Sequence, residues 1–271
     1  MQHKLIAFIG GGNMAQAIVL GLLKQGYPAK QIIVNDPNET KRAFFAELGV
    51  QTAQDNAVSA KRADAVLLAV KPQMMAEVCR CLAGVDFSDK LLISIAAGIS
   101  TARLQALIPS AKSVVRVMPN TPALVSEGMA GLFAAKNTAQ ADCIFVQELL
   151  NTVGKTLWLQ DEAQMHAVTA ASGSSPAYFF QMLEAMQQAL VEMNLDADSA
   201  CILVRQTIFG AAKMAIDNPQ LDFSTLRQNV TSKGGTTEAA LAVFNAQHFN
   251  QIVAQAMQAC AARSQEMEKL F

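Results

Sequence analysis

A short apolar run that leads directly into a glycine-rich turn constrains the fold of this chain more than any other feature. Leu5–Ile9 is followed by Gly10-Gly11-Gly12-Asn13-Met14-Ala15, a G-x-G-x-x-A pattern, and then by an amphipathic stretch. In such a turn Gly10 permits the sharp bend, Gly12 lets the backbone approach a pyrophosphate, and Ala15 allows close packing of helix on strand. The free N–H groups of the helix would face the anion. The pattern also suits a purely structural turn, but its place between a strand and a helix favours dinucleotide binding.

Up to about residue 160, short apolar runs alternate with amphipathic stretches such as 15–24, 41–48 and 74–82. This alternation predicts a parallel sheet with helices on both faces, which is the Rossmann-type, doubly wound α/β class. The expected strands are Leu5–Ile9, Ile32–Asn35, Ala65–Val70, Leu91–Ile95, Ser113–Val117, Gly128–Ala134 and Lys155–Leu159, with a weak one at 50–52.

The pattern changes after Leu159. Pro176–Asn194 and Ala197–Ile216 are long, helical and apolar almost all round, and a further helix is expected at Phe249–Lys269. A helix that is apolar on every face must be buried on every face. We therefore predict two domains: residues 1–161 bind NAD(P), and residues 162–271 form an all-α domain that packs against a second copy. A bundle core within one subunit is the alternative. Only seven charges lie between residues 163 and 217: Glu184, Glu192, Asp196, Asp198, Arg205, Lys213 and Asp217.

The charge balance excludes several classes of protein. Charged residues make up 16% of the 271 residues, against about 25% in ordinary soluble domains, and this shortage also suggests an oligomer. A formal net charge of -1 argues against nucleic acid and anionic membranes as partners. No uninterrupted apolar run approaches the roughly 18 residues that span a bilayer, and the N-terminal apolar run is too short for a secretion signal. The five cysteines are scattered and fit no zinc or redox pattern. We expect no metal, buried free thiols and a cytoplasmic location.

The end of the second strand bears on which nucleotide is bound. NAD-binding proteins usually place an acidic residue there, about 20 residues after the glycine turn, to bond the ribose 2′-hydroxyl. Asn35, which is neutral, stands at that place. Asp36 is one step along, so its side chain should point elsewhere, with a turn or cap role beside Pro37. Lys41 and Arg42 could offset the charge of a 2′-phosphate. We predict NADP as the cofactor, with NADPH preferred and NADH possible.

Other strand ends supply candidate residues for the crevice, because ligands of open parallel sheets bind beyond the carboxyl ends of the strands. Lys71 follows the fourth strand, although a solvated loop lysine is the alternative. The small residues of Ala96-Ala97-Gly98 would let a flat ring approach the fifth strand. Asn56 either caps a helix or touches cofactor ribose. The loop Met118-Pro119-Asn120-Thr121-Pro122 either lines the crevice or is a stiff corner.

A second glycine-rich loop, Asn229–Glu238, leads into another helix. Its glycines and hydroxyls ahead of a helix start form a small-anion cradle. The loop lacks the residue order of a P-loop, so a carboxylate is the expected guest, with an ordinary helix cap as the alternative. His3, His166 and His248 have no neighbours that suggest a catalytic triad, and His166 is expected in a core or an interface. Hydride transfer from a nicotinamide cofactor needs orientation of the substrate and one hydrogen-bond partner for it, which a hydroxyl of this loop would supply.

Taken together, these stretches resemble the pyrroline-5-carboxylate reductase family over nearly the whole chain. The resemblance implies reduction of 1-pyrroline-5-carboxylate to L-proline with NAD(P)H, the last step of proline biosynthesis. It also implies homodimers formed by interlocked C-terminal helical domains, which often assemble further into decamers. It rests on residues 8–15, Ala69-Val70-Lys71-Pro72, Ala96-Ala97-Gly98, Arg116–Pro122, Ala167–Ala170, Ser172–Tyr178 and the loop 229–238.

The resemblance further implies roles for single residues. Thr237 would be the catalytic residue and would bond the ring nitrogen. The backbone of Gly235, Thr236 and Thr237 would hold the substrate carboxylate, with Asn229 nearby. The cofactor would be held by Ile9, Gly10, Gly11, Gly12, Asn13, Met14, Asn35, Asn56, Ala69, Val70, Lys71, Ala96 and Ala97.

Three positions depart from the usual pattern of this family: Ser175 stands where Gly is usual, His166 where Asp is common, and Lys233 where Pro is common. Lys233 could add attraction for the substrate carboxylate. Two rival readings remain. The β-hydroxyacid dehydrogenases need a catalytic lysine early in the second domain, and no lysine occurs between Lys155 and Lys213. A non-enzymatic NADP-binding sensor would bind the cofactor without turnover.

Overall fold

A computed structural model describes residues 2–270 of the chain and divides it into two compact units. One unit holds the residues up to Pro176 together with those from Gln258 onward, and the other is Ala177–Met257. This division differs from the boundary expected after residue 161. The segments α7 (Gln164–Val168) and η4 (Thr169–Gly173) contact strand β7, and for this reason residues 162–176 group with the sheet.

The first unit contains one eight-stranded sheet, in the order β3-β2-β1-β4-β5-β6-β7-β8. Neighbouring strands are parallel throughout except for β6 and β7, which pair antiparallel. The order reverses at β1, because β2 and β4 lie on either side of it, and this confirms the doubly wound α/β class. The strands are β1 (Ile6–Ile9), β2 (Ile32–Asn35), β3 (Gln51–Ala53), β4 (Ala65–Leu68), β5 (Leu91–Ser94), β6 (Ser113–Met118), β7 (Gly128–Ala134) and β8 (Gly154–Trp158).

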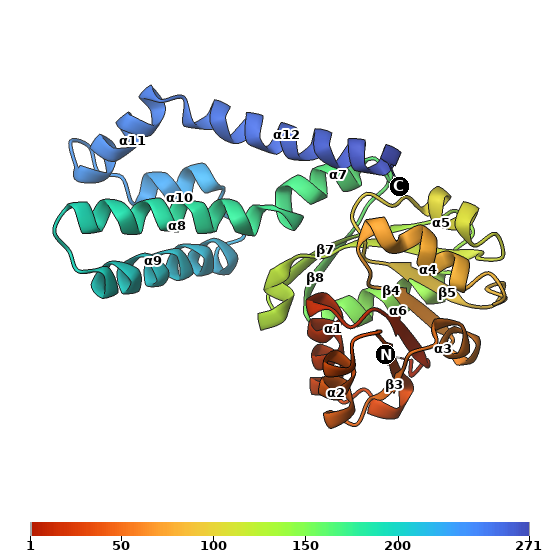
Figure 1. Cartoon of the computed structure of the whole chain (residues 1–271). Coiled ribbons are helices and arrows are strands. Elements are labelled where there is room, and N and C mark those ends of the chain that lie inside the picture. Colours follow the sequence, from red (N-terminus) through yellow and green to blue (C-terminus); the bar gives the residue numbers. More distant parts are fainter. Residues whose placement is uncertain (1, 271) are drawn as a thin grey trace. The chain divides into compact units, whose positions relative to one another are not determined.

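Buried side chains form a core on each of the two faces of this sheet, and Figure 1 shows helices on both sides of it. Successive side chains of a strand point to opposite faces, so Ile6 and Phe8 join one core while Ala7 and Ile9 join the other. The first core is closed by α1 (Asn13–Lys24), α2 (Glu39–Glu47) and α6 (Gln140–Asn151). The second is closed by α3 (Asn56–Arg62), α4 (Met75–Cys81) and α5 (Thr101–Leu107).

The cysteines are free, and one of them is fully buried. Cys79 and Cys81 are two residues apart on α4, so their side chains point to different sides of the helix. Cys79 lies in the second core, where burial raises the pKa of its thiol to about 11. Cys81 is exposed and Cys143, Cys201 and Cys260 are half-buried, so the expectation of buried thiols is confirmed for Cys79 alone.

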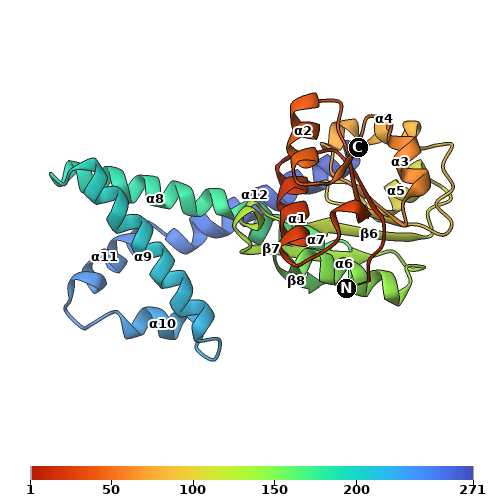
Figure 2. The same cartoon turned by 90° about the horizontal axis from the view of Figure 1, so that it is seen from below.

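The second unit is helical and leaves most of its apolar side chains uncovered. It contains nearly all of α8 (Ser175–Glu192), then α9 (Ala197–Asp217), α10 (Phe223–Asn229), α11 (Thr236–Ala246) and the first part of α12 (Phe249–Leu270). Figure 2 shows the loop that joins α10 to α11. Among the described residues of this unit only Ala200 and Val204 are buried as hydrophobic core. A bundle core within one subunit is therefore wrong. By length and composition α9 is also the one described helix that could cross a membrane.

Candidate functional site

The glycine turn after β1 is shaped by close approach of the backbone. Gly10 has a φ of +106°, and a Cβ at this position would lie 2.5 Å from the carbonyl oxygen of Ala69, at the end of β4. A Cβ at Gly12 would meet nothing within 4 Å, so the face of the turn beside Gly12 is open. Ala15 is fully buried against the sheet, which confirms its expected packing role. The turn thus leaves room for a bound group only where the sequence predicts a pyrophosphate.

The N-terminus of α1 is left without a side-chain cap, in contrast to its neighbours. Gly12 is the cap residue, and no side chain bonds the first turn of the helix. By comparison Asn38, Asp55 and Ser100 each accept a backbone N–H at the starts of α2, α3 and α5. The first N–H groups of any helix need a partner from outside the helix. At α1 they remain available to an anion, and the helix dipole favours one there.

Asn35 and Asp36, at the end of β2, have exchanged the roles expected from the sequence. The Asn35 side chain is buried: its Nδ2 donates to the Phe8 carbonyl (3.3 Å) and its Oδ1 accepts from Ser59 Oγ (2.8 Å). Asp36 Oδ2 instead accepts the N–H of Gly11 at 2.9 Å. The expectation that Asp36 points elsewhere is therefore wrong. Strand alternation stops at Asn35, the last residue of β2, and the chain turns toward the glycine loop.

The Asp36 carboxylate is held as an anion by several donors. Burial raises its pKa, but the N–H groups of Gly11 and Asn38 and the ammonium of Lys41 outweigh that effect, so the pKa lies below its ordinary value. Asp36 Oδ1 accepts from Asn38 N at 2.9 Å, which confirms the expected turn role, and Lys41 Nζ lies 3.2 Å from Oδ2. Arg42 donates to the Asp36 carbonyl at 2.7 Å. Both expected cations thus lie at the end of β2.

Other residues expected to contact the nucleotide lie after the ends of other strands of the same sheet. Lys71 is exposed and directly precedes the helical turn η2 (Pro72–Met74). Ala96 is buried and donates its N–H to Ser94 Oγ at 3.3 Å. Asn56 is the first residue of α3 rather than its cap, because Asp55 takes that role with its side chain. Asn120 bonds the Ser172 carbonyl and the Met129 N–H, so in the first unit it holds a corner of the chain.

A buried ionic cluster in this unit was missed by reasoning from the sequence. Arg116 on β6 is only 2% exposed, and its guanidinium lies 3.0 Å from both Glu162 and Glu268. The carboxylate of Glu162 also accepts the N–H and the hydroxyl of Thr101 at the start of α5. His166, a departure from the family pattern, is buried as expected and contacts Glu268 at 2.8 Å through Nε2. The sequence feature that could have revealed this cluster is the single arginine inside an otherwise apolar strand.

This cluster fixes the last turns of α12 beside the loop that follows β5. Ser264 Oγ lies 2.9 Å from Nδ1 of His166. A Cβ on Gly98 would meet Cβ of Met267 at 2.9 Å. Gly98 has a φ of +69°, so the small residue serves both the turn and the approach of α12. The last turns of α12 therefore pack against the loop Ala96-Ala97-Gly98, which is expected to face a flat ring.

The second glycine-rich loop lies in the second unit and has internal bonds of its own. Gly234, with a φ of +72°, donates its N–H to Glu238 at 2.6 Å. Gly235 donates to the Ser232 carbonyl at 3.0 Å and precedes α11 without any side-chain cap. The N–H group of Gly235 is therefore occupied. Among the described residues, the N–H groups of Thr236 and Thr237 have no acceptor, because they begin the helix.

Asn229 ends α10, and Gly235, Thr236 and Thr237 lie at the start of α11, so the four residues flank one loop of the second unit. The nucleotide candidates lie in the first unit. The sequence analysis gave Glu238 no role of its own. Its position as an acidic residue in the first turn of a helix is the feature that could have indicated one. Lys233 is exposed in the same loop.

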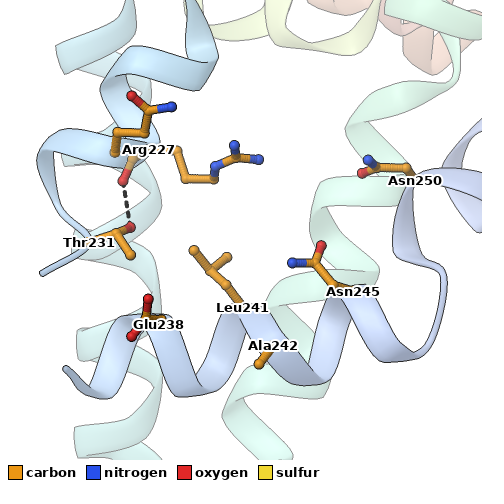
Figure 3. A pocket seen from close by; sticks show the side chains of 8 residues that line it. Arg227, Thr231, Glu238, Leu241, Ala242, Asn245 and Asn250 are labelled. Carbon is orange, nitrogen blue, oxygen red and sulfur yellow. Dashed lines mark hydrogen bonds between the residues drawn. The ribbon is translucent and has the colours of Figure 1, made fainter. Parts of the chain in front are cut away.

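A hollow of about 490 Å³ lies beside this loop (Figure 3). Arg227 and Thr231 border it from α10 and the segment after it, and Leu241 points into it from α11. The hydroxyl of Thr231 donates to the Arg227 carbonyl at 2.6 Å, which anchors the start of the loop. None of the four expected substrate residues in the described chain lines this hollow, so it does not coincide with the predicted carboxylate cradle.

Comparisons with known proteins agree across the whole chain. Residues 162–267 match the family described as pyrroline-5-carboxylate reductase dimerisation, and residues 5–98 match the family described as NADP oxidoreductase, coenzyme F420-dependent. A pyrroline-5-carboxylate reductase of Haemophilus influenzae is 74% identical over all of both chains. The structure of one from Coxiella burnetii is 38% identical, with a TM-score of 0.91 over 98% of this chain and 99% of that one. A Plasmodium falciparum pyrroline carboxylate reductase with NADP bound is 28% identical, with a TM-score of 0.87 over 99% of both chains.

Proposed function

This chain belongs to the pyrroline-5-carboxylate reductase family, and from that premise we propose how its own residues reduce 1-pyrroline-5-carboxylate to L-proline with NAD(P)H. One observation carries the proposal. Two helices, α1 and α11, each begin directly after a glycine and without a side-chain cap. One uncapped N-terminus suits a pyrophosphate and the other suits a carboxylate. A nucleotide and a small acid are the two ligands that this reaction needs.

The first unit offers a site of the right chemistry for the nucleotide. The open face at Gly12 fits a pyrophosphate, because the backbone there is bare and the helix N-terminus adds donors. NAD(P)H supplies the hydride when it is bound. Around it we assign Ala96 and Ala97 to the ring face, and Asn56 and Lys71 to the rim. The remaining assigned residues are Ile9, Gly10, Gly11, Asn13, Met14, Asn35, Ala69 and Val70; Asn35 would act through its backbone, since its side chain is occupied.

The second unit offers the substrate cradle. The unbonded N–H groups of Thr236 and Thr237 would hold the carboxylate of the pyrroline, with Asn229 nearby. Gly235 would contribute its bare backbone. The hydroxyl of Thr237 would donate a hydrogen bond to the ring nitrogen and so orient the C=N bond. The ring carbon of this imine bond would gain the hydride, and the nitrogen would gain a proton that solvent water supplies through the Thr237 hydroxyl, which gives the secondary amine of proline. No strong base is required, because the reaction removes no proton from the substrate.

We propose further that the uncovered helices of the second unit dimerise, and that dimers assemble into a decamer. The apolar side chains of α8 and α9 support this proposal, since Phe180 is 65% exposed and Phe209 is 63% exposed in the single chain. A second copy, rather than lipid, would cover α9, and the five free cysteines fit a reducing cytoplasm. The preference for NADPH stays a prediction. One of its premises was that Asp36 points away from the glycine turn, and the bond from Gly11 N–H to Asp36 removes that premise.

The experiment compares Thr237→Ala with Thr237→Ser and with the neighbouring Thr236→Ala. Loss of one well-placed hydrogen-bond donor typically lowers turnover about 10²-fold. We expect Thr237→Ala to lose kcat on this scale while its affinity for NADPH is unchanged. Thr237→Ser should keep most of the activity because it keeps the hydroxyl, and Thr236→Ala should keep kcat because only its backbone is used. Full turnover by Thr237→Ala would reject the assigned role.

A further inference from the structure

We propose that the buried cluster around Arg116 serves the reaction by positioning the loop Ala96-Ala97-Gly98, against which the nicotinamide ring would lie. This inference rests on the proposed use of NAD(P)H, because that proposal assigns Ala96 and Ala97 to the ring face. Arg116 itself is assigned to neither ligand, so its effect on hydride transfer would pass through the loop. We therefore class Arg116 as a positioning residue.

The loop itself offers little with which to hold its place. Its three residues have no polar side chain that could anchor it. Gly98 adopts a φ of +69°, a conformation that side-chain-bearing residues rarely adopt. The N–H of Ala96 donates to Ser94 Oγ at 3.3 Å, which is long for a hydrogen bond. The position of the loop therefore depends on the segments that pack against it.

The first support is Glu162, which fixes the chain just after the loop. Thr101 donates its backbone N–H to Glu162 Oε1 at 2.8 Å and its hydroxyl to Oε2 at 2.7 Å. Thr101 is the first residue of α5 and follows Gly98 by three positions. Hydrogen bonds to a carboxylate are stronger than those between neutral groups. Glu162 thus holds the point at which the loop enters the helix.

The second support is the last part of α12, which contacts the loop through its backbone. A Cβ on Gly98 would lie 2.9 Å from Cβ of Met267 and 3.4 Å from the backbone nitrogen of Glu268. Loop and helix approach each other too closely here for either to shift alone. A displacement of this end of α12 would therefore move Gly98 with it.

The Glu268 side chain fixes that end of α12 from two directions. Its Oε1 lies 3.0 Å from Arg116, and its Oε2 lies 2.8 Å from Nε2 of His166. A carboxylate only accepts hydrogen bonds, so the imidazole donates from Nε2. Nδ1 of the same ring lies 2.9 Å from Ser264 Oγ, one turn earlier on α12. His166 thus holds two successive turns of the helix.

Arg116 joins the two supports through one atom. Its Nη1 lies 3.0 Å from Oε1 of Glu162 and 3.0 Å from Oε1 of Glu268. The arginine is 2% exposed, so water screens these contacts little. The loop is therefore held at Gly98 by one carboxylate-bearing segment and after Gly98 by the other, with a shared buried cation between them.

A purely structural role for this cluster makes a different prediction. If it only stabilises the fold, its variants unfold more easily, but each folded molecule turns over at the normal rate. If it positions the loop, folded molecules react more slowly, since misplacement by about 1 Å costs up to about 10²-fold in rate. The fragment 2′,5′-ADP has no nicotinamide, so its affinity should not depend on the loop.

The test weakens each support separately in the full chain. Thr101→Val removes the hydroxyl that bonds Glu162, and Thr101→Ser keeps it. Glu268→Gln removes the carboxylate charge on α12, and Glu266→Gln is its matched control because Glu266 is 62% exposed on the same helix. Urea unfolding first establishes that each variant is folded at the temperature of the assays.

We expect Thr101→Val and Glu268→Gln to lower kcat about tenfold. With NADPH deuterated at the transferable position, their isotope effect on kcat should rise, because hydride transfer becomes slower relative to the other steps. Calorimetry without pyrroline should show NADPH binding about two- to tenfold more weakly, since only a fraction of molecules would hold the loop in place. The affinity for 2′,5′-ADP should not change. Thr101→Ser and Glu266→Gln should match the wild type.

Normal kcat and normal NADPH affinity in folded Thr101→Val and Glu268→Gln would overturn the inference. Equal weakening of NADPH and 2′,5′-ADP would overturn it as well, because the nucleotide site as a whole would then have changed. Thr101→Val removes a single hydroxyl and keeps the inference testable if Glu268→Gln unfolds. Wild-type protein that binds NADPH without reducing 1-pyrroline-5-carboxylate would refute the proposed function, whereas the two affinities would still test the loop.

Discussion

Replacement of Arg116 by methionine tests whether the buried ionic cluster holds the end of α12 on the sheet. Arg116 is 2% exposed and contacts Glu162 and Glu268 at 3.0 Å each. Arg116→Met keeps much of the side-chain volume but leaves two carboxylates without their shared cation. Breaking a buried pair in this way costs about 3–5 kcal/mol. That loss is a large share of the roughly 5–15 kcal/mol by which folded proteins are stable.

Arg263→Met is the matched control, because it removes an arginine that also pairs with a glutamate of α12. Arg263 and Glu266 are 64% and 62% exposed, and they lie three residues apart on the same helix. An exposed pair of this kind contributes about 0–1 kcal/mol. The two variants therefore separate burial of the charge from mere loss of an ion pair.

The assay is urea unfolding of both variants and the wild type at one fixed protein concentration, since association shifts apparent stability. The midpoint for Arg116→Met should fall well below that of the wild type with a similar slope, while the Arg263→Met midpoint should stay close to it. Equal midpoints for the two variants would refute the reasoning, because the cluster would then contribute no more than a surface pair.

Three further outcomes follow from the geometry. Gly10→Ala should destabilise the fold, because its Cβ would lie 2.5 Å from a carbonyl oxygen. Gly12→Ala should fold normally but bind the nucleotide more weakly, because its Cβ would occupy the open space expected to hold the pyrophosphate. Thermal unfolding measures the first effect and calorimetry the second, and equal stability of both variants would count against the account. Lys233→Ala should raise the KM for the pyrroline without changing kcat, and an unchanged KM would remove the role suggested for this lysine. Phe209→Glu should yield smaller assemblies in sedimentation, because it replaces an apolar side chain that is 63% exposed in the single chain with a charged one at the proposed interface. An unaltered assembly would place the interface elsewhere.

The sheet could be predicted from the sequence because each strand is a short apolar run with polar or glycine-rich borders. Ile32–Asn35 and Gly128–Ala134 coincide with β2 and β7. Burial on both faces makes parallel strands continuously apolar, and this signal is local. The glycine turn was equally readable, because a close approach of backbone leaves little choice of residue at Gly10.

The direction of Asp36 could not be predicted, since alternation of side chains is a property of strands and ends where β2 ends. The partners of Arg116 were also out of reach, because Glu268 follows it by 152 residues and no local pattern links the two. For the same reason the return of the last turns of α12 to the first unit was not expected. The backbone role of residues such as Thr236 was inferred from the family resemblance alone. Their free N–H groups depend on where α11 begins, which only the structure shows.

Transfer of a labelled hydride tests the central claim most directly. The protein is incubated with 1-pyrroline-5-carboxylate and NADPH that carries deuterium at the transferable position of the nicotinamide, and the product is examined by mass spectrometry and NMR. The account predicts L-proline with deuterium on the ring carbon that is bonded to the nitrogen and does not carry the carboxylate, formed in step with oxidised cofactor. Proline without deuterium, or bound cofactor that stays reduced in the presence of the pyrroline, would contradict it.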